Sequence, residues 1–151
     1  MKIKVLVGSG DKIALFTLPF LVVGLATNIA YPAIFAVGGP HVALRVVALV
    51  ALAAGIVIWA WSAFLILTHV PQGRLITTGP FAVVKHPLYT GVALLVLPAI
   101  GVLLDTWLGA AIGLVMYLGS RWFASAEESQ MAALFGARWD RYISGVKVRW
   151  L

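Results

Sequence analysis

The chain has 151 residues, of which 62% are hydrophobic and only 11% charged, and it contains no cysteine. This composition excludes disulfides, thiolate chemistry and a soluble domain of any size. The net charge is +6, but the basic residues do not form a stripe on a soluble fold that could bind phosphates, so we expect no nucleic-acid binding. We interpret the charge as membrane orientation and contact with anionic membrane lipids.

After a basic leader at residues 1–12, the chain is dominated by long apolar stretches. A helix needs about 20 apolar residues to cross a bilayer, and about four stretches are long enough. We therefore predict an all-α fold: a polytopic integral-membrane helical bundle with an amphipathic helical segment after it. The single membrane domain would hold two spans in residues 13–68, a polar loop at 69–87, a helical hairpin at 88–126 and a C-terminal segment at 127–151.

Several residues inside the apolar stretches predict local features. The first span is expected at residues 13–37, where Asn28 and Tyr31-Pro32 indicate a bend, or alternatively a polar contact inside the bundle. Pro98 predicts a bend in the third span. Four tryptophans are typical of an interfacial belt, with ligand contact as the alternative: Trp59, Trp61, Trp107 and Trp122.

The basic residues predict the orientation. Of the 11 Lys and Arg residues, only Arg45 lies at the end of the helical path opposite to both termini and the polar loop. Basic loops remain on the cytoplasmic side of a membrane. We therefore expect a multi-pass protein whose termini and polar loop are cytoplasmic.

The polar loop ends in a segment rich in Gly and Pro that carries Lys85, His86 and Tyr89. Pro87 keeps His86 out of the α region and allows a helix to begin at Pro87 or Leu88. His86 and Tyr89 would then lie where the free N–H groups of that helix start project, which favours anion binding. A membrane-surface loop with a snorkelling lysine and an interfacial tyrosine is the alternative.

A short turn at Asp105-Thr106 makes the third and fourth spans antiparallel neighbours. It brings the start of one span beside the end of the other, at the cytoplasmic face, and so groups His86, Tyr89, Arg121, Glu127 and Glu128. These groups suit an amino-acid-like cofactor such as S-adenosylmethionine, with its ammonium on a glutamate and its carboxylate on His86 or Lys85. Methyl transfer needs chiefly alignment and a dry site. No carboxylate or cysteine lies at metal-ligand spacing from a histidine, so we expect no metal.

Two segments carry a family signature. The first is Gly79-Pro80-Phe81 followed by Lys85-His86-Pro87-Leu88-Tyr89-Thr90-Gly91, and the second is Glu127-Glu128 followed by Met131, Phe135-Gly136, Trp139, Tyr142 and Val146. In order and spacing they resemble the isoprenylcysteine carboxyl methyltransferase family, which is related to the phospholipid N-methyltransferases. The resemblance covers roughly residues 73–149.

This resemblance implies an integral-membrane methyltransferase that uses S-adenosylmethionine. The methyl acceptor would be a lipophilic small molecule or lipid that enters between helices, while the cofactor arrives from the cytoplasm. Arg121 and Glu127 take the catalytic positions. The implied cofactor-binding residues are Leu75, Ile76, Phe81, Lys85, His86, Pro87, Leu88, Tyr89, Glu127 and Glu128.

The chain also departs from the family pattern. Lys85 replaces an arginine, Phe81 replaces a tyrosine, and the substrate-binding arginine expected one turn before the glutamates is missing, with Arg121 the nearest substitute. The acceptor therefore stays open. Side chains of adjacent helical residues diverge by about 100°. We expect Glu127 to face the pocket, and Glu128 to face solvent or the basic tail.

Two other classes remain open. Membrane sterol and enone reductases resemble these methyltransferases in their C-terminal helices and use NADPH, but generally have more spans. A non-enzymatic membrane protein would explain the helices and the charge bias, but not the joint placement of His86, Tyr89 and the glutamates.

Overall fold

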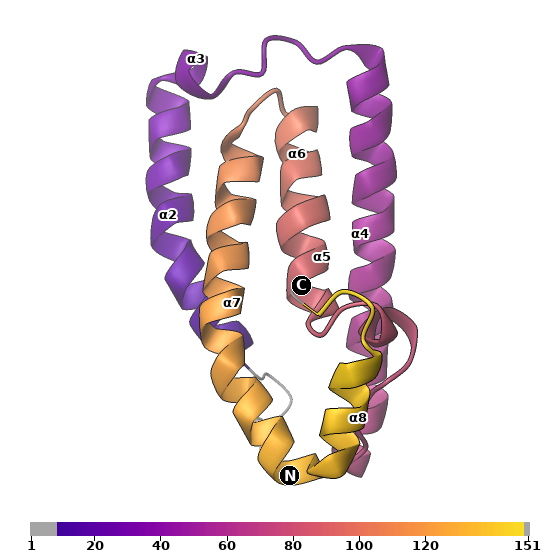
Figure 1. Cartoon of the computed structure of the whole chain (residues 1–151). Helices are drawn as coiled ribbons and strands as arrows, with labels where there is room; N and C mark the ends of the chain where they lie inside the picture. The colour runs from indigo at the N-terminus through magenta and orange to yellow at the C-terminus, as the bar shows by residue number, and fades with distance from the viewer. Residues whose placement is uncertain (1–8, 150–151) are drawn as a thin grey trace.

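The computed structural model describes residues 9–149, and within this range the chain forms helices and no β-strand. The predicted all-α fold is therefore confirmed. Figure 1 shows the long helices lying side by side along one axis. Most of the predicted leader at residues 1–12 lies outside the described residues.

The first helix, α2 (Gly10–Ala30), is followed by a short turn of helix, α3 (Pro32–Phe35). The span predicted at residues 13–37 is interrupted at Tyr31, where the bend was expected, because a residue before a proline disfavours the α conformation. The bend and the polar contact both occur. The Thr106 hydroxyl donates a hydrogen bond of 3.0 Å to Asn28 Oδ1.

Helix α4 (Val42–His69) follows Pro40 and continues into the 3₁₀ turn η1 (Val70–Gln72). Among the described residues, α2 and α4 with η1 are long and apolar enough to cross a membrane, whereas the apolar stretch Pro87–Leu103 is shorter. Helix α7 (Leu108–Phe135) is long but carries Arg121, Glu127 and Glu128. The structure thus identifies two candidate spans where the sequence predicted four.

The third long helical segment of the bundle begins at Pro87, one of the two residues at which a helix was predicted to begin. It consists of α5 (Pro87–Gly91), the π-helical turn η3 (Val92–Val96) and α6 (Leu97–Leu103). Proline has no N–H to donate into the preceding turn. Near Pro98, where a bend was predicted, the helix contains the wider π-helical turn η3, which ends two residues before the proline.

A turn with Asp105 at φ +56° joins α6 to α7, and the two helices pack closely. Helix α7 continues past residue 126, where the last span is predicted to end. Residues 127–135 contain neither Gly nor Pro, so α7 runs on to Phe135. The glutamates therefore lie inside a helix and not at its negative end, where they would be disfavoured.

The α6–α7 packing depends on glycine. A β-carbon on Gly109 would lie 2.7 Å from the Cα of Gly101 and closer still to the carbonyl oxygen of Leu97. We expect Gly109→Ala to lower the free energy of unfolding by about 1–3 kcal/mol through overpacking. Thermal unfolding of purified protein in detergent would measure it. Gly145→Ala is the matched control, because its β-carbon would meet nothing within 4 Å. Equal stability of the two variants would contradict this close approach.

The fold separates the basic residues along its axis. The start of α2, the end of α4, the end of α7 and the helix α8 (Ala137–Gly145) lie at one end in Figure 1, and the start of α4, with Arg45, lies at the other. Arg121 lies near the middle of α7, and the other described basic residues belong to the first end: Lys12, Arg74, Lys85, Arg138, Arg141, Lys147 and Arg149.

Candidate active site

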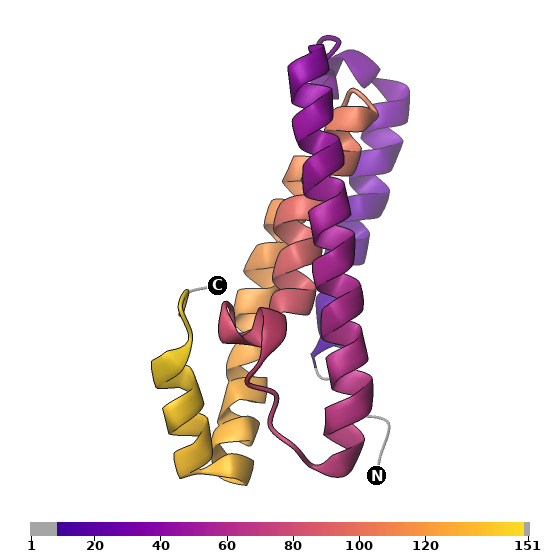
Figure 2. The same cartoon turned by 90° about the vertical axis from the view of Figure 1, so that its right-hand side faces the viewer.

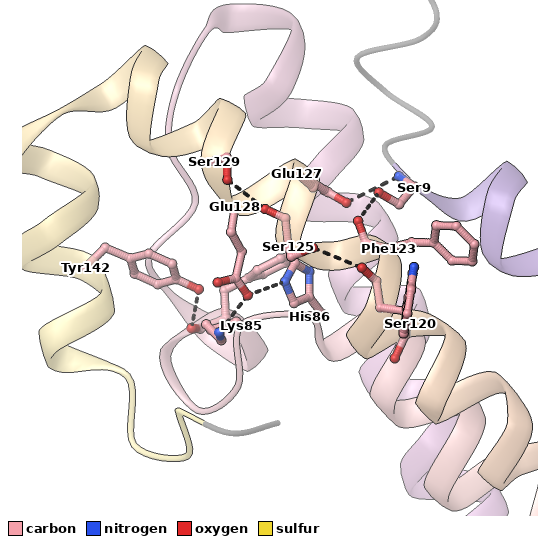
Figure 3. Close-up of polar contacts among 12 residues, drawn as sticks. Ser9, Lys85, His86, Ser120, Phe123, Ser125, Glu127, Glu128, Ser129 and Tyr142 are labelled. Atoms are coloured by element: carbon pink, nitrogen blue, oxygen red, sulfur yellow. Dashed lines mark hydrogen bonds and ion pairs between the residues drawn. The ribbon is translucent and has the colours of Figure 1, made fainter.

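The two sequence motifs meet where the start of α5 packs against the C-terminal part of α7 (Figure 3). His86 is the residue before the first helical turn, and Pro87, which is fully buried, takes the first helical position. Proline suits this position because the N–H it lacks would have no helical partner there. The turn presents Lys85 and His86 to α7.

Glu128 is the centre of the polar contacts. Its Oε1 accepts a hydrogen bond of 2.6 Å from Lys85 Nζ and lies 3.1 Å from His86 Nε2. The three side chains are only 28%, 11% and 14% exposed, respectively. The hydrogen bond to His86 and the charge of Lys85 lower the pKa of Glu128 to about 2, against the opposing effect of burial. Glu128 is therefore an ionised carboxylate in a half-buried site.

Glu127 has a different environment. Its Oε2 accepts a hydrogen bond of 3.2 Å from the backbone N–H of Ser9, at the start of α2, while the Ser9 hydroxyl donates to the carbonyl of Phe123. Figure 3 shows the two glutamates turned to opposite partners. We expected Glu127 to face the pocket and Glu128 to face solvent or the basic tail; in the structure, Glu128 contacts Lys85 and His86, and Glu127 contacts Ser9. The packing of α2 against α7 gives the second carboxylate a partner.

The C-terminal segment folds back over this region. Helix α7 ends at Phe135. The next residue, Gly136, has a φ of +51° that is unfavourable for residues with a side chain, and α8 follows at once. The buried Tyr142 hydroxyl donates a hydrogen bond of 3.0 Å to the carbonyl of Phe81. Burial and the nearby charge of Glu128 raise the pKa of Tyr142 to about 12, so it remains a donor.

Beyond α8, the backbone N–H of Val148 donates a hydrogen bond of 2.9 Å to the carbonyl of Val83. Figure 2 shows α8 alongside the end of α7, with the tail reaching back to the loop before α5. The contact ties the end of the described chain to the turn that holds Lys85 and His86.

These elements enclose a cavity of about 170 Å³ with mostly apolar walls. The charged residues among its lining are Arg74, Lys85, Glu127 and Glu128. The walls come from the end of α4, the loop before α5, the end of α7 and the inner face of α8. The cavity is lined by Ile66, Val70, Gly73, Arg74, Leu75, Ile76, Phe81, Lys85, His86, Tyr89, Glu127, Glu128, Met131, Leu134, Phe135, Trp139 and Tyr142.

Residues 33–138 match the family model of the phospholipid methyltransferases. The chain belongs to the phospholipid methyltransferase family. The match confirms the resemblance inferred from the two motifs, and it covers both the turn before α5 and the glutamates. No curated protein and no solved structure matches the chain.

Most residues implied by the resemblance line the cavity of this family member. Pro87, Leu88 and Arg121 do not: Pro87 is buried behind the turn, Leu88 is half-buried, and Arg121 is exposed on α7. Within residues 9–149 no cluster of metal-ligating side chains forms. The implied residues that line the cavity are Leu75, Ile76, Phe81, Lys85, His86, Tyr89, Glu127 and Glu128.

Sequence reasoning missed several contributors. Ile66 comes from the end of α4, Val70 from η1, and Ser9 from the position before α2; nothing in their local sequence distinguishes them from other apolar or small residues. Tyr142 was part of the second sequence motif, but no role in the site was predicted for it; the glycine before α8 predicts only a helix end and a reversal of the chain. Tyr142 lies outside the region that matches the phospholipid methyltransferases, which ends at Arg138.

Proposed function

We propose that the protein transfers a methyl group from S-adenosylmethionine to a lipophilic acceptor at the cytoplasmic face of a membrane. The observation that carries the proposal is Glu128, an ionised carboxylate held between Lys85 and His86 in a cavity whose walls are mostly apolar. Membership of a methyltransferase family supports the reaction class.

The cavity fits an amino-acid-like cofactor. The carboxylate of Glu128 suits an ammonium group, while Lys85 and His86 beside it suit a carboxylate. Phe81 and Tyr89 offer aromatic surface for a purine ring. The cofactor would supply a methyl group activated by its sulfonium. The residues of this chain would bind and orient it, and the apolar walls would exclude water.

A lipophilic acceptor is consistent with the apolar walls and with the flanking helices. Ile66 and Val70, which line the cavity, belong to the long apolar segment Val42–Gln72. An acceptor dissolved in the lipid phase could approach along that segment, while the cofactor enters from water at the basic end. We propose the same orientation for the protein, with that end and both termini in the cytoplasm.

A reporter fused after Leu151 is expected to be cytoplasmic, because nearly all basic residues lie at that end. A fusion at Gly39, between α3 and α4, is the control and should report the opposite side. A third fusion at Asp105 tests whether the α5–α6 segment and α7 also cross the membrane, and we expect it to match Gly39. A non-cytoplasmic Leu151 fusion would contradict the orientation, and a cytoplasmic Asp105 fusion would contradict four spans.

The reaction class is tested by ligand stabilisation. S-adenosylhomocysteine in excess over its dissociation constant should raise the thermal unfolding midpoint of the purified protein, because it binds only the folded state. NADPH at the same concentration should leave it unchanged. Stabilisation by NADPH alone would favour a membrane reductase, and stabilisation by neither would favour a non-enzymatic protein.

A further inference from the structure

A second pocket adjoins the cavity. It is an open groove of about 590 Å³ between the loop that follows η1 and helix α8. Both elements lie at the basic end of the bundle, as Figure 2 shows. The groove shares part of its lining with the cavity, and it is formed by Gly73, Arg74, Leu75, Thr77, Arg138, Arg141 and Tyr142.

The charge of this groove is entirely positive. Arg74, Arg138 and Arg141 are exposed, and within residues 9–149 none of them forms an ion pair with a carboxylate. No Asp or Glu belongs to the lining residues. Arg138 and Arg141 are three positions apart on α8 and therefore share a helix face. The fold brings Arg74 to them from a loop distant in sequence, and leaves three like charges without a counter-charge.

An anion would relieve this repulsion, and the donors indicate which kind. Each planar guanidinium offers a fork of N–H groups that matches two oxygens of a phosphate. The exposed Thr77 forms no hydrogen bond with another described residue, so its hydroxyl is a further donor. Donors from both the loop and α8 suit the several oxygens of a phosphate better than the two of a carboxylate.

We propose that this groove binds a phosphate group, beside the cavity and separately from the cofactor. The group could belong to a soluble phosphate ester or to the headgroup of an anionic lipid. The proposal does not depend on methyl transfer, because it uses residues outside the Lys85–His86–Glu128 cluster.

Calorimetric titration of the purified full-length protein, at constant ionic strength, tests the site. The probes are inorganic phosphate, glycerol 3-phosphate and short-chain dihexanoyl phosphatidylglycerol below its micelle concentration. Arg138→Gln/Arg141→Gln keeps two good helix formers in α8 and should weaken phosphate binding at least about tenfold, since each lost hydrogen bond involves a charged group. Arg45→Gln, at the opposite end of the bundle, is the matched control and should bind as the unaltered protein does.

The outcomes separate the sources and the two sites. Similar binding of all three probes would support recognition of the phosphate group itself, and binding of phosphatidylglycerol alone would support a lipid headgroup. No saturable binding, or equal loss in Arg45→Gln, would overturn the proposal. S-adenosylhomocysteine is titrated into the same variants. A parallel loss of its affinity in the double variant would make the groove part of the cofactor site and overturn a separate one, whereas unchanged affinity would support it.

Discussion

Glu128→Gln is expected to abolish measurable binding of S-adenosylhomocysteine to a folded protein. The substitution removes the carboxylate proposed to hold the cofactor's ammonium, and it leaves Lys85, only 11% exposed, without its partner. Removing one member of a buried charged pair costs about 3–5 kcal/mol, which corresponds to a loss of affinity of about a hundredfold or more. Isothermal titration calorimetry in detergent would measure the affinity.

Glu127→Gln is the matched control, because the same change is made at the next residue of α7. Its carboxylate accepts a hydrogen bond from the backbone of Ser9, and an amide oxygen can accept the same bond. We therefore expect a loss of affinity below about tenfold, in line with a net contribution of about 1 kcal/mol for one hydrogen bond. Near-normal binding by the double Gln variant would remove the basis for a cofactor site here.

His86→Ala should weaken S-adenosylhomocysteine binding at least about tenfold while the protein stays folded, because a hydrogen bond to a charged group contributes about 1.5–3 kcal/mol. The imidazole is 3.1 Å from Glu128 Oε1, and its ring stacks on Tyr89 with centroids 6.3 Å apart. Losing both contacts would leave Glu128 less fixed in the cavity. The affinity and the thermal unfolding midpoint should be measured on the same preparation.

Two further variants sharpen this test. His41→Ala removes an exposed histidine at the opposite end of the bundle and should change neither quantity. His86→Gln places an amide near the imidazole Nε2 and should recover part of the affinity if the hydrogen bond is what matters. If folded His86→Ala binds S-adenosylhomocysteine normally, His86 has only a structural role.

The local features of the site were predictable because they depend on neighbours in sequence. Pro87 fixes a helix start and so places His86 at its edge. The short turn at Asp105 makes α6 and α7 antiparallel, which brings the glutamates to the same end as His86. Hydrophobicity and spacing alone therefore indicated which ends of which helices would meet.

The sequence by itself determined the helical class, the family motifs and the end of the bundle where they gather. The tertiary structure decided which glutamate contacts Lys85 and His86, that Ser9 reaches Glu127, and that α8 folds back to close the cavity. The physical reason is that helical periodicity fixes directions only within one helix. The partner that a side chain meets depends on how α2, α5, α7 and α8 pack. This packing joins residues far apart in the sequence, such as Ser9 and Glu127, which are 118 positions apart.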